Sequence, residues 1–160
     1  MTADVNILLV VAISAALIFA LTNGLHDASS VVATFIACGA ATAKQALILA
    51  VVFGFLGSML GGSTVANTVS SIVSVNINPS LLVIILSAIL AAIGWNVLIW
   101  YFGLPSSSTH ALIGGIIGAV WAASGFHQVL WGWNELFGVP HQLTGLMKVF
   151  IGLMLAPPLG

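Results

Sequence analysis

The chain has 160 residues, of which 61% are hydrophobic and 3% are charged, and its formal net charge is −1. Soluble domains carry about 25% charged residues, so two basic and three acidic side chains are too few to cover a water-facing surface. This composition predicts an integral membrane protein, and the lack of a basic patch argues against nucleic-acid binding.

The first third of the chain holds three apolar segments. Val5–Leu21 approaches the roughly 20 residues that a membrane-spanning helix needs. Polar residues follow at 22–27, before a short apolar segment, so residues 22–40 are expected to form a discontinuous helix or the second part of one long broken helix. A third apolar run, Ala46–Leu60, passes into residues 61–74, which are rich in Gly, Ser, Thr and Asn.

The clearest full-length span is Leu81–Phe102. A turn signal precedes it at residues 76–79, and a break follows at residues 103–106. Leu112–Ala123 is apolar but short for a span. Together with the polar residues 105–110, it predicts a re-entrant helical hairpin or a half-helix.

The last part of the chain begins with its most soluble-looking stretch, residues 126–144. Tryptophans gather at the headgroup level of membranes, so this stretch is expected to be an interfacial loop or surface helix. Leu143–Leu155 starts another apolar helix. The expected fold is all-α, with residues 1–160 forming a single multi-pass domain in the cell membrane.

Two Gly-x-x-x-Gly pairs, Gly57/Gly61 and Gly114/Gly118, lie in apolar segments. Such pairs let helix backbones approach closely, so they predict tight packing of helices. They are common in membrane helices and indicate no particular function.

The first polar cluster has helical spacing. Asn23, Asp27, Ser30 and Thr34 are separated by four, three and four residues, so they share one face of a helix. The alternative for the hydroxyls is bonding to their own preceding carbonyls, as is common in membrane helices. That alternative does not account for Asp27, because a carboxylate inside a membrane segment is a functional-site candidate by default.

Two other polar features of this region remain open to interpretation. His26, beside the cluster, either binds or relays a cation or proton, or hydrogen-bonds across helices. A further set at helical spacing either lines the same cavity or helps helices to pack, and it comprises Ser63, Asn67, Ser70 and Ser74.

The second polar cluster, residues 105–110, reads Pro-Ser-Ser-Ser-Thr-His. Its proline suits the start of a new helix, which Ser106 or Ser107 can cap. The unpaired N–H groups of the first turn, with hydroxyl donors from Ser107, Ser108 and Thr109, would form an anion site. The alternative is an ordinary capped helix at the membrane surface.

The charges near these clusters suggest a coupled ion. The chain has no arginine, and neither lysine lies in a cluster, so neutral donors would hold an anion close to Asp27. Like charges repel strongly where the dielectric constant is low, and a cation between them would remove the repulsion. Co-transport of an anion with Na⁺ or H⁺ follows as a hypothesis.

These motifs resemble the inorganic phosphate transporters of the Pit type. The most specific is Gly-Leu-Pro-x-Ser-Ser/Thr-x-His at residues 103–110. The His-Asp pair at 26–27 is similar to the bacterial low-affinity branch, which is viewed as proton-coupled and able to carry metal–phosphate complexes. The resemblance covers nearly the whole chain and rests on residues 23–28, 32–34, 55–57, 60–62, 95–96, 100–110 and 113–114.

The resemblance implies a fold of two inverted repeats, each with a broken helix and a helical hairpin. It implies secondary active transport of phosphate rather than an enzyme, with no cofactor and no resident metal. The candidate phosphate-binding residues are Asp27, Ser30, Ser106, Ser107, Ser108 and Thr109. The candidate cation-coupling residues are Asn23, His26, Asp27 and His110.

The sequence departs from the family pattern in two ways. Ser29-Ser30 stands where the family usually has Ala-Asn, and the second Asn-Asp motif and second Pro-Ser-Thr hairpin are absent. The chain therefore resembles the N-terminal half alone, expected to pair as a homodimer or with a second half-transporter chain. The alternative is a transport-inactive truncated paralogue or a partner subunit of a membrane complex. An intramembrane serine hydrolase using His110 and Asp27 is disfavoured, because no nucleophile elbow is visible.

Overall fold

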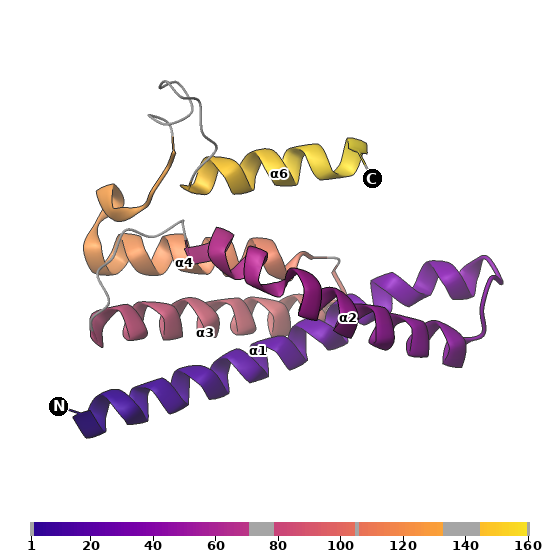
Figure 1. Cartoon of the computed structure of the whole chain (residues 1–160), viewed down its shortest axis with the longest axis horizontal. Coiled ribbons are helices and arrows are strands. Elements are labelled where there is room, and N and C mark those ends of the chain that lie inside the picture. Colours follow the sequence, from indigo (N-terminus) through magenta and orange to yellow (C-terminus); the bar gives the residue numbers. More distant parts are fainter. Residues whose placement is uncertain (1, 71–78, 105, 133–144, 160) are drawn as a thin grey trace.

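The computed structural model describes residues 2–70, 79–104, 106–132 and 145–159, and the regular elements in these ranges are helical (Figure 1). Within these ranges, three helices contain segments that are long and apolar enough to cross a membrane, as expected for an all-α membrane protein. These segments are Val5–Ala37, Ala43–Ser63 and Ser80–Phe102. The helices are α1 (Thr2–Ala37), α2 (Ala43–Ser70), α3 (Pro79–Phe102), α4 (Ser108–Ser124), the 3-10 helix η1 (Phe126–Gln128) and α6 (Gly145–Leu159).

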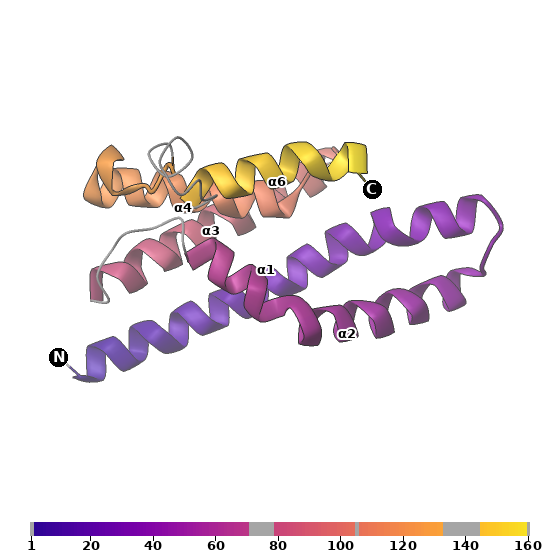
Figure 2. The same cartoon turned by 45° about the horizontal axis from the view of Figure 1, so that its top comes forward.

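The helices form a loose bundle in which α3 packs against both α1 and α4. Helices α1 and α3 run in the same direction, and α2 and α4 run back (Figures 1 and 2). Helix α2 contacts α1, and α4 is joined to α3 by a short connection, so α3 and α4 form an antiparallel helical hairpin. This hairpin brings residues near 108 close to α1.

The break predicted at residues 22–27 is absent, because α1 is one continuous helix of 36 residues. The hydroxyls of Thr22 and Ser29 donate to backbone carbonyls three residues earlier, at 2.9 and 2.8 Å. The Thr34 hydroxyl likewise donates to the Val31 carbonyl at 3.4 Å, so the bonds of Ser29 and Thr34 are those that the alternative interpretation of the hydroxyls predicted. Gly24 alone does not end a helix, since a glycine costs only about 1 kcal/mol relative to alanine.

A reciprocal cap starts α2 after the turn at the end of α1. The Thr42 hydroxyl and backbone N–H both contact Gln45 Oε1, at 2.9 and 3.0 Å, and the Gln45 N–H donates back to Thr42 Oγ1 at 3.4 Å. This is a capping box, which satisfies backbone donors that have no partner inside the helix. The cap defines where the second span begins.

We expect Thr42→Ala to loosen the first turn of α2 without disturbing the bundle. Loss of a helix cap costs about 1 kcal/mol, which corresponds to about a fivefold faster amide exchange of residues 43–46. Hydrogen-exchange mass spectrometry measures this change. Ser58→Ala is the matched control, because its hydroxyl donates only to the Phe55 carbonyl within the same helix. Unchanged exchange in Thr42→Ala would show that the cap contributes no local stability.

Small residues let α3 and α4 approach closely. Gly115 of α4 faces the backbone of Ala88, and a Cβ atom on Gly115 would lie 2.6 Å from the Ala88 carbonyl oxygen. Gly114 and Gly118 have nothing within 4 Å, so the close contact falls beside the Gly-x-x-x-Gly pair and not on it. The buried stripe of α3 consists of Ile84, Ala88, Ala92, Asn96 and Ile99.

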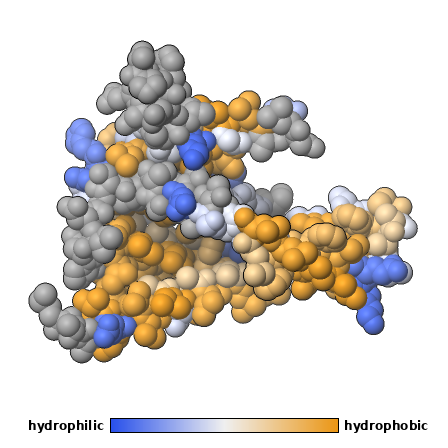
Figure 3. Space-filling view, viewed as in Figure 1, coloured by the Kyte–Doolittle hydropathy of each residue, from blue (hydrophilic) through white to orange (hydrophobic). Residues whose placement is uncertain are grey.

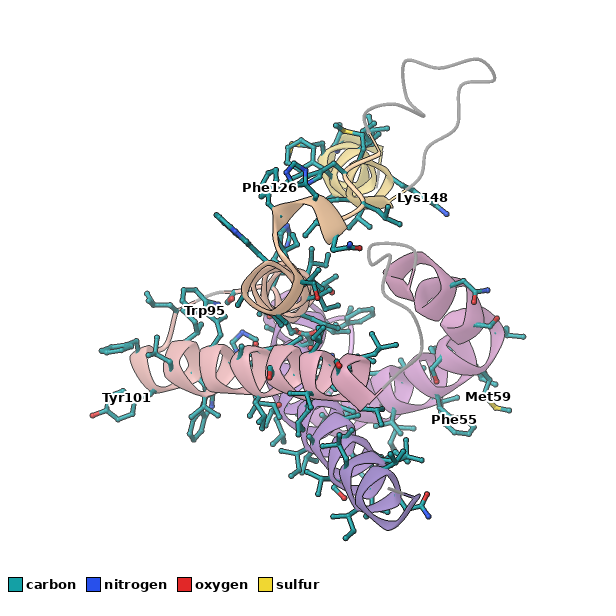
Figure 4. The ribbon with its side chains drawn as sticks, turned by 90° about the vertical axis from the view of Figure 1, so that its left-hand side faces the viewer. Phe55, Met59, Trp95, Tyr101, Phe126 and Lys148 are labelled. Atoms are coloured by element: carbon teal, nitrogen blue, oxygen red, sulfur yellow. The ribbon has the colours of Figure 1, made fainter. Side chains whose placement is uncertain are left out.

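Large apolar side chains cover the outside of the bundle. Phe55 and Met59 on α2 and Tyr101 on α3 are 64%, 70% and 80% exposed, and they point away from the bundle (Figure 4). Apolar residues extend along α1 and α2, and hydrophilic residues gather at the end of these two helices where the chain passes from α1 to α2, on the right of the view (Figure 3). Exposed apolar surface of this extent is typical of helices in contact with lipid.

The C-terminal helix confirms the apolar helix predicted at residues 143–155, although it begins at Gly145 and reaches Leu159. Backbone bonds from Leu146 and Met147 to the carbonyls of residues 130 and 131, at 2.8 and 3.1 Å, hold its start. Parts of three other predictions lie outside the described residues. They are the turn with its neighbouring polar residues at 71–78, Pro105, and residues 133–144 of the expected interfacial stretch.

Candidate functional site

The first turn of α4 is capped by Ser107. This residue has extended backbone angles, φ −107° and ψ 115°, and its Oγ accepts a hydrogen bond from the His110 N–H at 3.4 Å. The cap is one of the two that the sequence allowed. It leaves the other N–H groups at this helix start pointing along the axis, where the helix dipole favours an anion.

Two contacts define how α4 lies along α3. The indole Nε1 of Trp95 donates to Ser106 Oγ at 3.3 Å, and Gly115 lies against Ala88, about two turns away along α3. Figure 4 shows Trp95 on the side of α3 that faces α4. Because the two helices are antiparallel, Ser108 lies opposite the α3 turn that carries residues 92–96.

Ser108 and Asp27 bring the two polar clusters into contact. The Ser108 hydroxyl lies 3.2 Å from each carboxylate oxygen of Asp27, and it can donate to either one. Ser108 is only 2% exposed, and Asp27 is partly buried. A carboxylate with a buried hydroxyl donor is thus held between α1 and the hairpin, although the two residues are 81 positions apart in the chain.

On the α1 side, the contact lies inside an apolar span. Asp27 belongs to the span Val5–Ala37, and Asn96 on the facing α3 turn stands six residues before Phe102, where the helix ends. Six residues correspond to about 9 Å of helix. Polar groups inside apolar spans are costly to desolvate, so Asp27 and its Ser108 contact remain candidates for a binding site.

Two asparagines have buried side-chain atoms without a hydrogen-bond partner. They are Oδ1 of Asn23 on α1, and both Oδ1 and Nδ2 of Asn96 on α3, which is 3% exposed. Sequence reasoning assigned a role to Asn23 but used Asn96 only as part of a family motif. The position of Asn96 could have marked it as a candidate, because it is a polar residue that continues the four-residue spacing of apolar residues along the clearest span.

The remaining predicted residues do not converge on Asp27. Ser107 and His110 line an open groove of about 690 Å³ between α3 and α4, together with Trp95 and Ser106. Thr109 and Ser30 are exposed, and His26 is partly buried. The predicted site is therefore divided between the α1-facing side of the hairpin and the groove. Within the described ranges, no three His, Cys, Asp or Glu side chains group together as metal ligands would.

Comparison with known proteins identifies the family. A model described as the phosphate transporter family matches residues 23–160, which include both polar clusters. The chain belongs to the phosphate transporter family. Membership agrees with the apolar spans, and the protein is a multi-pass protein of the cell membrane. No solved structure matches the chain.

Relatives in the phosphate transporter family are similar along most of this chain. A probable low-affinity inorganic phosphate transporter of Bacillus subtilis (strain 168) is 36% identical over 151 residues, covering 94% of this chain and 42% of the relative. One of Streptomyces halstedii with the same description is 42% identical over 149 residues, covering 92% and 69%. A low-affinity inorganic phosphate transporter of Escherichia coli (strain K12) is 41% identical over 118 residues, covering 71% and 24%. The chain thus spans less than half the length of the first and third of these relatives.

Proposed function

We propose that the chain takes part in the symport of inorganic phosphate with H⁺ or Na⁺ across the cell membrane. The observation that carries this proposal is the contact of Ser108, at the start of α4, with Asp27 inside the apolar span of α1. The family and its relatives support phosphate as the transported anion. The contact supplies the reason for coupling, because it joins an acid that attracts a cation to a helix start that attracts an anion.

The coupling follows from the single proton of the Ser108 hydroxyl. A serine hydroxyl has one O–H donor, so it cannot donate to Asp27 and to a phosphate oxygen at the same time. When H⁺ or Na⁺ neutralises the Asp27 carboxylate, the hydroxyl is released to donate to phosphate. Binding of the cation therefore raises the affinity of this site for phosphate, and binding of phosphate raises its affinity for the cation.

The candidate residues take two roles in this proposal. Ser106, Ser107, Ser108, Thr109 and Ser30 would donate to phosphate, with Asp27 acting through the cation. Asn23, His26, Asp27 and His110 would serve the cation. The groove beside Ser107 and His110 would give phosphate a polar approach to the α4 start, since its walls of Ala and Gly leave room.

The proposed transport pathway requires more than one such unit. Helix α4 has 17 residues and is about 25 Å long, which is short for a span of about 30 Å. We infer that α3 and α4 form a re-entrant hairpin and that residues 1–160 form one repeat of an inverted-repeat transporter. A second copy or a second half-transporter chain would supply the opposing repeat. A transport-inactive paralogue or partner subunit is the alternative function.

Reconstituted uptake tests the proposal. Liposomes that contain the purified chain should accumulate labelled phosphate when an inward H⁺ or Na⁺ gradient is imposed, and crosslinking should show a dimer or partner complex. Uptake that ignores both gradients would contradict coupling. The same liposomes without any phosphate uptake would favour the transport-inactive alternative.

We expect Ser108→Ala to weaken phosphate uptake at least about tenfold at low phosphate concentration. The change removes one hydroxyl donor, and a hydrogen bond to a charged group contributes about 1.5–3 kcal/mol at most. Initial uptake rates over a range of phosphate concentrations measure the effect as a raised KM. Ser14→Ala is the matched control, because its hydroxyl donates only to Val10 within α1. An unchanged KM in Ser108→Ala would remove this residue from the site.

A further inference from the structure

A side-chain hydrogen bond holds the connection between α3 and α4 in place. The end of α3 is a Schellman motif, in which the N–H groups of residues 103 and 104 donate to carbonyls of the last helical turn, each at 3.1 Å. Gly103 has the positive φ, 63°, that this motif requires. Beyond the motif, Ser106 Oγ accepts the indole N–H of Trp95 at 3.3 Å (Figure 4). The connection is thus fixed at its α3 end by backbone bonds and near its α4 end by Trp95.

The direction of this bond determines what the Ser106 hydroxyl can do. An indole N–H only donates, whereas a serine hydroxyl has one O–H donor and two acceptor lone pairs. Ser106 therefore accepts the Trp95 N–H and keeps its own O–H, for which the described residues supply no acceptor. Ser87 in the same groove differs, because its hydroxyl donates to the Val83 carbonyl at 2.8 Å, a common arrangement in membrane helices. The Ser106 O–H is thus available to a ligand.

The neighbouring hydroxyl of Ser107 is held in the same way. Its Oγ accepts the His110 N–H at 3.4 Å, and no group in the described ranges accepts its O–H. Ser106 and Ser107 therefore form a pair of hydroxyls that each accept an N–H and still have a proton to donate. Both line the groove of about 690 Å³ together with Trp95. Two adjacent donors fit a ligand with several acceptor oxygens, such as a phosphate anion.

We propose that Trp95 is a positioning residue, whose indole N–H keeps the Ser106 hydroxyl donating to the anion bound at the start of α4. This inference rests on the proposed function, because it takes phosphate to bind at this helix start. Hydrogen bonds in a chain polarise one another, so a hydroxyl that accepts an N–H donates more strongly to an oxygen. Without the indole N–H, the Ser106 side chain is free to change rotamer, and ordering it again opposes binding.

Equilibrium binding of labelled inorganic phosphate tests this role. The purified full chain in detergent is titrated at fixed pH and NaCl concentration. We expect Trp95→Phe to raise the phosphate Kd roughly threefold to tenfold, since it removes one neutral hydrogen bond and keeps an aromatic ring. Trp100→Phe is the matched control, because the Trp100 side chain is 73% exposed and has no hydrogen-bond partner among the described residues. Its Kd should equal that of the wild-type chain.

A second background separates positioning from a purely structural role. In Ser106→Ala, the hydroxyl that Trp95 orients is gone, so adding Trp95→Phe should change the Kd by less than about twofold. A Trp95→Phe effect of the same size in both backgrounds would overturn the proposal. Equal Kd values for Trp95→Phe and the wild-type chain would overturn it as well.

An isosteric replacement covers the case in which Trp95→Phe does not fold. Benzothienylalanine introduced at position 95 exchanges the indole N–H for sulfur and keeps the shape of the ring. We expect the same rise in Kd with an unchanged melting temperature, and a wild-type Kd in this variant would contradict the role of the N–H. Phosphate uptake is measured separately, so a chain with the expected Kd values that transports no phosphate contradicts only the proposed function. A wild-type chain that binds no phosphate contradicts both.

Discussion

Replacing Asp27 by Asn is expected to reduce phosphate uptake at least about tenfold, with the amount of chain in the membrane unchanged. The amide has nearly the same shape and still offers an oxygen to Ser108, so the hairpin contact can persist. The negative charge that attracts the coupled cation is lost, and bonds to charged groups contribute about 1.5–3 kcal/mol, where 1.4 kcal/mol is tenfold. Labelled phosphate uptake, normalised to membrane expression, measures the change.

Ser29→Ala provides the control for Asp27→Asn on the same helix. The Ser29 hydroxyl donates to the His26 carbonyl at 2.8 Å, inside α1, so its loss should leave uptake within about twofold, as for exposed positions. Retained uptake in Asp27→Asn would rule out the role assigned to this carboxylate. Equal loss in both variants would instead indicate that α1 as a whole is sensitive to substitution.

Replacing Gly115 by Ala is expected to force the α3–α4 hairpin apart. The new Cβ would lie 2.6 Å from the Ala88 carbonyl oxygen and 3.3 Å from its carbon, and both are backbone atoms that no rotamer change can move. Overpacking of this kind costs about 1–3 kcal/mol. Thermal unfolding of the purified chain should show a lower melting temperature, and phosphate binding should weaken because the hairpin positions Ser108.

The neighbouring glycine makes a matched control for this substitution. A Cβ on Gly114 meets nothing within 4 Å, and alanine favours a helix over glycine by about 1 kcal/mol. Gly114→Ala should therefore leave the melting temperature unchanged or raise it slightly. If Gly115→Ala is as stable as Gly114→Ala, the close packing of the hairpin described above is wrong.

Composition and hydropathy were sufficient to predict the membrane helices, because apolar length alone determines whether a segment can cross the bilayer. The full-length span at 81–102 matches α3 almost residue for residue. The prediction of a break at 22–27 was wrong, because a run of polar residues within an apolar segment resembles the end of a helix. The hydroxyls of Thr22 and Ser29 instead bond to the helix's own carbonyls, an outcome that hydropathy does not distinguish from a break.

The proximity of the two polar clusters could be predicted from the sequence, but the hydroxyl that contacts Asp27 could not. The expectation that neutral donors hold an anion close to Asp27 required the cluster at Asp27 and the cluster at 105–110 to lie close together. Which hydroxyl faces α1 depends on how α4 is rotated on α3, and this rotation follows from the contact of Gly115 with Ala88. The same rotation turns His110 into the groove, and its part in cation coupling stays a prediction.

The most direct test of the account is a double-mutant cycle on phosphate affinity with Asp27→Asn and Ser108→Ala. The affinities of the wild-type chain, both single variants and the double variant are measured at a saturating concentration of the coupling cation. Residues that contact each other and share a ligand should be non-additive, with a coupling energy of about 0.5–3 kcal/mol. Effects that simply add would mean that the acid on α1 and the hydroxyl on α4 act independently, and would contradict a shared site for phosphate and its cation.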